Sequence, residues 1–288
     1  MAGLGWREKL MDRRVALAFA VAACVASGNA WAADPFEIQV YDGTSNTPGV
    51  PAIELHVNHV TRGVKEGVFP VLPADKQTHF TFEPSLGITK SWELGAYFQM
   101  ALRADGQIDF AGSKLRSKFV TPPRWDPHWR LGINFELASI PTNYDRDHWG
   151  GEVRPIVAWA NDTWLFAMNP ILGTSFAGPG LKQGPGFAPA AMVVYDIAHV
   201  VGLGVEYYAD FGAFSAFDRL SQQQHYVYEV FHLLAVEDME LQLGVGEGLT
   251  AGSNPLVYKM IIGYTLDPRP DAEKQAVRRA PRSLARVR

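Results

Sequence analysis

Apolar and polar residues alternate along most of this chain, a period of two that is typical of β-strands with one apolar and one polar face. Between residues 80 and 102, for example, Phe80, Phe82, Leu94 and Phe98 fall on the apolar side. No segment of useful length has the period of a helix, so the sequence predicts an all-β fold. The predicted strands are residues 53–62, 77–89, 92–103, 107–119, 128–140, 151–160, 163–173, 188–197, 200–210, 225–236, 239–249 and 256–266.

The connections between these strands mostly alternate between two-residue turns and long loops rich in Gly, Pro, Asn and Asp. The exceptions are 104–106 and 250–254, which are short on the loop side, and 120–127, which is long on the turn side. Short turns at one end and long loops at the other are typical of outer-membrane barrels, whose tilted strands are about 9–11 residues long. We therefore predict a transmembrane antiparallel up-and-down β-barrel of about 12 strands, with the N and C termini periplasmic. The predicted long loops are residues 63–76, 141–150, 174–187 and 211–224.

Four tryptophans, Trp92, Trp129, Trp159 and Trp164, lie on the apolar face of their predicted strands, and each is close to a connection on the predicted periplasmic side. Amphipathic rings at one level of an apolar face are typical of a membrane-interface girdle. A soluble β-sandwich or lipocalin-like binder is the alternative fold, but it has little reason to collect indoles at one end of its core. The tryptophans therefore favour lipid as the solvent of the apolar face.

The opposite face of the strands carries glycines and charged side chains of both signs, which suits the crowded interior of a barrel. Twelve strands imply a narrow pore or a lumen largely filled by side chains. The side chains that we expect to line the lumen are Glu54, His56, Asn58, Glu83, Glu93, Gln99, Arg103, Arg130, Asn134, Glu136, Arg154, Glu206, Glu229, Glu240, Gln242 and Lys259.

The two ends of the chain differ from its body. Two arginines at 13 and 14 precede an apolar run over 15–25 and an A-x-A motif at 30–32, which predicts a cleaved secretory signal peptide over 1–32, translated from Met1 or Met11. The alternative is a lipoprotein with a lipidated Cys24, which is the only cysteine. We further predict a periplasmic segment or partial plug over 33–52, the barrel over 53–266, and a basic disordered tail over 267–288.

The formal net charge is −4, and basic residues gather in the tail, so the body of the chain is more acidic than this total. An acidic body argues against nucleic acid as a partner. The mature chain has no cysteine, which excludes disulfides and thiolate metal sites. The charge favours a cationic or neutral solute.

Residues that could carry catalysis are sparse. There is no HExxH or GxSxG motif and no outward-facing pair of serine and histidine, so we expect no catalytic residue, cofactor or metal. Glu54, His56 and Asn58 share one face of the first strand, where they form either a metal-contacting cluster or an ordinary polar face, and we favour the ordinary polar face.

Two passages resemble known proteins. Residues 36–43 (FEIQVYDG), with Pro48-Gly49 and 54–58 (ELHVN), resemble a group of uncharacterised exported proteobacterial outer-membrane proteins. Residues 87–95 (GITKSWELG) resemble the strand-turn-strand repeat of outer-membrane transporters assigned to phenol degradation, the MetA-pathway type. This resemblance implies a barrel with a transport role, and it carries over no site residues.

The function predicted from the sequence is that of a passive channel or transporter for small solutes in the outer membrane of a Gram-negative cell. The alternatives are an outer-membrane lipid hydrolase and a non-catalytic structural or adhesion barrel. The expected partners are outer-membrane lipid, a small-molecule solute and the barrel-insertion machinery.

Overall fold

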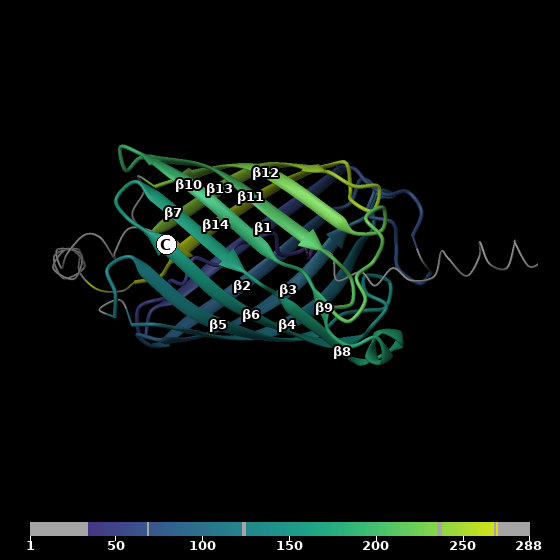
Figure 1. The fold of residues 1–288 in the computed structure, drawn as a ribbon, viewed down its shortest axis with the longest axis horizontal. Coiled ribbons are helices and arrows are strands. Elements are labelled where there is room, and N and C mark those ends of the chain that lie inside the picture. Colours follow the sequence, from purple (N-terminus) through teal and green to yellow (C-terminus); the bar gives the residue numbers. More distant parts are fainter. Residues whose placement is uncertain (1–33, 68, 123–124, 235–237, 268, 270–288) are drawn as a thin grey trace, which may run out of the picture.

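The computed structural model describes residues 34–67, 69–122, 125–234, 238–267 and 269. Its strands follow one another around a closed antiparallel barrel, in which the first strand pairs with the last (Figure 1). The elements are β1 (Pro51–Arg62), β2 (Thr78–Thr89), β3 (Trp92–Leu102), β4 (Ile108–Val120), β5 (Trp129–Ser139), β6 (Trp149–Ala160), β7 (Trp164–Asn169), β8 (Leu172–Ala177), the 3-10 helix η1 (Pro179–Lys182), β9 (Gly186–Phe187), β10 (Ala190–Ile197), β11 (Val201–Asp210), β12 (Gln224–Leu233), β13 (Met239–Gly248) and β14 (Leu256–Thr265).

Twelve strands form the barrel wall, because β7 and β8 are two parts of one strand and β9 only adds two residues beside β8. The predicted closed antiparallel barrel of about twelve strands is therefore confirmed. Among the described residues, no helix is long and apolar enough to cross a membrane. The predicted signal peptide, both start codons, Cys24 and nearly all of the predicted tail lie outside the described residues.

The strand predicted over residues 163–173 is longer than expected and is interrupted near its middle. β7 ends at Asn169, and β8 continues from Leu172 to Ala177, into the predicted loop. Pro170 lies at the break, where its missing N–H cannot donate to a neighbouring strand. The ladder with β6 is accordingly split into one stretch with β7 and another with β8.

The two ends of the barrel differ in their connections, as the sequence predicts. We call the end with the connections 90–91, 161–163 and 198–200 the turn end, and the end with 63–77, 140–148 and 211–223 the loop end. β1 begins and β14 ends at the turn end. Because neighbouring strands are antiparallel, this shared end sets the direction of each strand from β2 to β13.

The outer face of the barrel is apolar. On β3, Leu94 and Phe98 are 39% and 49% exposed, whereas the alternating Tyr97 and Gln99 are completely buried in the interior. A soluble protein does not expose so much contiguous apolar surface, whereas a barrel that closes its backbone hydrogen bonds within the wall can present it to lipid. The apolar face of the wall is therefore its outer face, where it can contact lipid.

The interior has an apolar half and a charged half. Inward residues of β7, β10, β11 and β12 form one apolar cluster, which includes Val194, Tyr228 and Val230. Many inward residues of β2 to β6 are instead charged or polar, and they are buried as deeply. The prediction of a polar lumen is therefore correct for about half of the inner face of the wall.

Residues 34–50 run through the lumen before β1 begins. Phe36 packs against His79 and Tyr144 near the loop end, and the N–H of Gly49 donates to the carbonyl oxygen of Gly87 near the turn end, 2.8 Å away. Figure 1 shows the purple trace of this segment inside the barrel. The structure therefore does not place it as a periplasmic extension beyond the turn end. We call residues 34–50 the inner segment.

Candidate functional site in the barrel lumen

Most of the side chains predicted to line the lumen point inward and are buried. Glu54 and Glu240 are half-buried on inward positions toward the turn end, and Arg103 is half-buried just beyond β3 at the loop end. The predicted lumen residues that are buried on the inner face are His56, Asn58, Glu83, Glu93, Gln99, Arg130, Asn134, Glu136, Arg154, Glu206, Gln242 and Lys259.

The prediction is wrong for Glu229. This side chain is exposed and lies between Val205 and Val245 on the neighbouring strands, and both of these valines are exposed on the outer face. The central inward residues of β12 are Tyr226, Tyr228 and Val230, which belong to the apolar half of the interior, and Gln224 and His232 lie on the same face toward its ends. Both faces of β12 are therefore largely apolar. The charge of Glu229 could not show which face is turned to the lumen.

The inner segment is an alternating stretch whose two sides match the two halves of the lumen. Ile38 and Val40 join the apolar cluster, whereas Glu37 and Tyr41 face the charged strands. The backbone is held as well, because Asn169 accepts from the N–H of Tyr41 at 2.7 Å and donates to its carbonyl oxygen at 3.0 Å. This pattern explains why an extended segment, which pairs with the wall only at an isolated bridge between Pro48 and Gly87, packs inside the barrel.

Glu37 is the central anion of the charged half. Its side chain is completely buried, and its carboxylate lies 3.4 Å from the Lys114 ammonium and 3.3 Å from the Arg154 guanidinium. It also accepts a hydrogen bond of 2.9 Å from the Tyr41 hydroxyl, which is 2.6 Å from the Tyr97 hydroxyl. Charge-assisted contacts of this kind are strong in a low-dielectric interior, so Glu37 anchors the inner segment to β3, β4 and β6.

A second charged group surrounds Arg116 on β4, nearer to the turn end. Its guanidinium contacts Glu83 at 2.6 Å and Glu93 at 2.7 Å, and Lys118 contacts Glu93 at 3.0 Å. The N–H of Asn46 in the inner segment donates to the other oxygen of Glu93 at 2.6 Å. Glu93 thus connects the wall to the inner segment at a second point.

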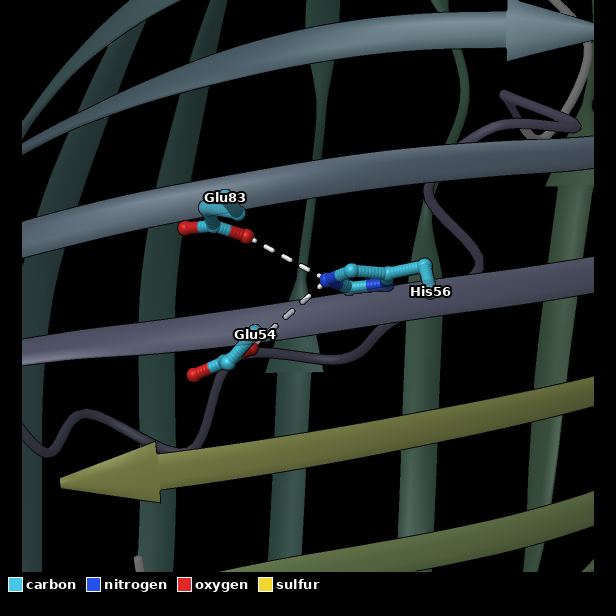
Figure 2. A group of neighbouring side chains, drawn as sticks. All are labelled: Glu54, His56 and Glu83. Carbon is cyan, nitrogen blue, oxygen red and sulfur yellow. Dashed lines mark hydrogen bonds and ion pairs between the residues drawn. The ribbon is translucent and has the colours of Figure 1, made fainter.

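Glu54, His56 and Glu83 form a compact cluster beside this group, as Figure 2 shows. The Nε2 atom of His56 points between the two carboxylates, 3.6 Å from Glu54 and 3.3 Å from Glu83. Gln39 of the inner segment donates to Glu54 at 3.2 Å. The cluster therefore lies at the contact between the wall and the inner segment.

Lys259 on β14 supplies a third contact with the inner segment. Its ammonium donates to the carbonyl oxygen of Ile38 at 3.0 Å and forms a buried ion pair with Glu206 on β11. Gln242 donates to the other oxygen of Glu206 at 2.8 Å. The charged contacts therefore hold the inner segment from both sides of the barrel.

The sequence prediction missed the most connected cations of the lumen. Lys114, Arg116 and Lys118 alternate with Leu115 and Phe119 along β4, so the period of two would have identified them. It also missed Glu37 and Tyr41, because nothing in the local pattern says that a segment outside the predicted barrel enters it. Residues contributed by the inner segment became visible only in the fold.

Several inward polar atoms have no hydrogen-bond partner among the described residues. Both amide atoms of Gln99 are unpaired in this way, as are the Oδ1 atoms of Asn58 and Asn134. Buried polar atoms in folded proteins are normally paired with protein or with ordered water. These positions are therefore where water or a polar solute can bind inside the lumen.

The four predicted girdle tryptophans lie on the outer face near the turn end. Trp129 and Trp159 are paired across β5 and β6, and Trp164 is paired with Tyr195 across β7 and β10. Trp92 stacks on Phe119 of β4 and donates through its indole N–H to a serine hydroxyl at 3.0 Å. Aromatic rings thus lie on the outer face near the turn end of β3, β4, β5, β6, β7 and β10.

The loop between β5 and β6 covers part of the loop end and carries two carboxylates. Asp147 is buried, and it accepts hydrogen bonds from the Ser175 hydroxyl and from the N–H of Gly180, the latter at 3.0 Å. Asp145 accepts from the N–H of Asp147 at 2.9 Å. Burial, together with the negative charge of Asp147, raises the pKa of the Asp145 carboxyl to about 7.

Comparison with known proteins gives similarity of structure only. The sequence matches no known protein-family profile and no curated protein. The fold is similar to that of an outer membrane channel from Pseudomonas putida F1, with a TM-score of 0.53 and 12% identity over 80% of this chain and 100% of that chain. It is also similar to the NanC porin, with a TM-score of 0.49 and 9% identity over 75% of this chain and 99% of that chain. The first of these similarities shows that the chain has the fold of an outer-membrane β-barrel.

Proposed function

We propose that this protein is a passive channel for small solutes in the outer membrane, and that the inner segment restricts its lumen. The observation that carries the proposal is the polar and charged inner wall of the closed barrel, which includes buried amide atoms that have no partner in the described part of the chain. A barrel that only anchors or displays loops has no need to keep such costly groups inside. The similarity in fold to the outer membrane channel from Pseudomonas putida F1 supports the same function.

The proposed solutes are small and are neutral or cationic. The lumen contains both signs of charge, and the inner segment runs through it in contact with Lys114, Arg154 and Lys259. Only a small solute fits beside the segment or through the space that it leaves when it moves. The likeness of residues 87–95 to transporters of the MetA-pathway type makes small aromatic alcohols a further candidate class of neutral solute.

A lipid hydrolase is the weaker proposal. Within the described residues, no serine hydroxyl is hydrogen-bonded to a histidine ring. Ser253, for example, contacts the backbone N–H and carbonyl oxygen of His225 instead. The proposed role is therefore transport without catalysis.

The test is solute flux into liposomes that contain the purified full chain. A swelling assay compares small and large neutral sugars, and then cationic and anionic amino acids of similar size. We expect flux to fall steeply with solute size and to be faster for the cationic amino acid. Liposomes with heat-denatured protein are the control. Flux no greater than this control would exclude a channel and leave the structural barrel, and recovery of the protein in the soluble periplasm would exclude both.

A further inference from the structure

We propose that Glu54, His56 and Glu83 form a binding site for a divalent first-row transition metal, with Zn²⁺ as the probe of choice. The three side chains offer one imidazole nitrogen and two carboxylate oxygens, all within 4.8 Å of one another. They come from adjacent strands, because Glu54 and His56 share the inner face of β1 and Glu83 is opposite Glu54 on β2. The site is independent of the proposed transport function, and each can fail without the other.

The separations between the donor atoms suit a metal better than a direct ion pair. The His56 Nε2 atom is 3.3 Å from Glu83 Oε2 and 3.6 Å from Glu54 Oε2. A charge-assisted hydrogen bond between such groups is about 2.7–2.9 Å long. Two ligands at about 2.0–2.2 Å from a tetrahedral Zn²⁺ lie about 3.3–3.5 Å apart, which is close to both separations.

The chemistry of the donors selects the class of metal. Imidazole is a common ligand of Zn²⁺, Cu²⁺, Ni²⁺ and iron, whereas Ca²⁺ and Mg²⁺ take oxygen ligands. Glu83 has one oxygen held by Arg116 at 2.6 Å, which leaves its Oε2 atom for the site. Arg116 therefore orients this ligand as outer groups do in known metal sites.

The local charge provides an independent reason for a cation. Glu54 and Glu83 are directly opposed on neighbouring strands, an arrangement that is unfavourable for like charges. Glu240 lies one strand beyond Glu54, across Gly263, where a side chain would meet both glutamates at 3.2 Å. Gly263 thus lets two carboxylates approach each other.

The neighbouring cations do not balance these carboxylates. Arg116 contacts Glu83 and Glu93, and Lys118 contacts Glu93, so two positive charges face the four carboxylates of Glu54, Glu83, Glu93 and Glu240. His56 supplies a third positive charge when it is protonated, whereas a histidine that binds a metal is neutral. With His56 neutral, the group carries two more negative than positive charges in a largely buried place. A divalent cation balances this charge, whereas uncompensated charge in a protein interior is costly.

The surroundings offer contact with solvent and a further polar partner. The Glu54 side chain is 21% exposed, so the cluster is accessible to water and ions. Gln99 lies in the same inward row as His56, beyond Thr81, and it is completely buried with neither amide atom paired among the described residues. A metal-bound water is the kind of partner that such an amide can take.

The experiment measures Zn²⁺ binding by titration calorimetry on the full chain in detergent, after removal of any purification tag. We expect one Zn²⁺ per chain for the unaltered protein and at least about a tenfold loss of affinity in His56→Gln and in Glu54→Gln. His59→Gln is the matched control, because His59 is on the same strand, faces outward and contacts Thr78. Its affinity should stay within about twofold of the unaltered protein.

Two results would overturn the proposal. The first is the absence of Zn²⁺ binding to the unaltered chain, which would show that the cluster is an ion pair of His56 with two glutamates. The second is an unchanged affinity in His56→Gln, which would place the metal elsewhere. Heat-modifiable gel mobility shows whether His56→Gln folds. If it does not fold, the visible spectrum of the unaltered chain with Co²⁺ replaces the variant as the test. Intense bands of tetrahedral Co²⁺ would support the site, and a weak octahedral spectrum would contradict it.

Discussion

The substitution Glu37→Gln tests how the inner segment is held. It keeps the shape of the side chain and an oxygen that can accept from Tyr41, and it removes the negative charge. Lys114 would retain Asp34 at 2.5 Å and Glu136 at 3.2 Å, and Arg154 would retain a second carboxylate. The variant therefore weakens the anchor and leaves both cations partly compensated.

The size of the effect follows from the burial of these charges. Breaking a buried ion pair by removing one partner costs about 3–5 kcal/mol. Because both cations keep another carboxylate, we expect a smaller cost of about 2 kcal/mol, just below that range. If the inner segment leaves the lumen in a two-state manner, this cost raises the displaced fraction about 30-fold, since about 1.4 kcal/mol corresponds to a factor of ten.

The assay is the open probability of single channels in planar lipid bilayers. Glu37→Gln should open more often than the unaltered chain without a change in the conductance of the open state. Glu229→Gln is the matched control, because it neutralises a glutamate on the outer face, away from the inner segment. An open probability of folded Glu37→Gln equal to that of the unaltered chain would refute the idea that this ion pair holds the segment in place.

Three further predictions concern other parts of the barrel. Gly87→Ala should lower the free energy of urea unfolding by about 1–3 kcal/mol, because a Cβ atom would lie 2.4 Å from the carbonyl oxygen of Asn46. An unchanged free energy would mean that the inner segment does not pack closely against β2. Glu229→Leu should raise the same free energy by about 1–2 kcal/mol by removing a charge from the lipid-facing surface, and a decrease would reveal a partner for this carboxylate. The Asp145 carboxyl binds its proton more tightly in the folded protein, since its pKa is raised from 3.8 to about 7, so the loop 140–148 should lose hydrogen-exchange protection as the pH rises through that interval. Asp145→Asn should remove this pH dependence, and an equal slope in the variant would assign it to another group.

The barrel itself could be predicted from the sequence because each strand is determined by residues that are close together in the chain. Each strand must present one face to lipid and one to the interior, so the period of two gives both the strand and its orientation. β3 illustrates this, since Leu94 and Phe98 are outward and Glu93 and Gln99 are inward as predicted. The interruption at Pro170 could also have been anticipated, because proline cannot donate to a strand ladder.

The interior was harder to predict because its filling is not local. Glu229 was misplaced because β12 is apolar on both faces, and its inner face packs against Ile38 and Val40 of the inner segment. The role of Glu37 was invisible for the same reason, since its partners Lys114 and Arg154 are far away in sequence. The alternation of apolar and polar residues shows which face of a strand is turned to lipid. It does not show that another segment of the chain occupies the interior of the barrel.

The central claim is that small solutes pass through this barrel and that the inner segment controls their passage. A chain with Asn46→Cys and Ser85→Cys tests it directly, because these two side chains are hydrogen-bonded at 2.8 Å and join the segment to β2. In planar bilayers we expect little current while the engineered disulfide is formed, and current like that of the unaltered chain after reduction. Equal currents in the oxidised and reduced states, with the disulfide verified by mass spectrometry, would contradict control by the segment, and no current in either state would contradict the channel.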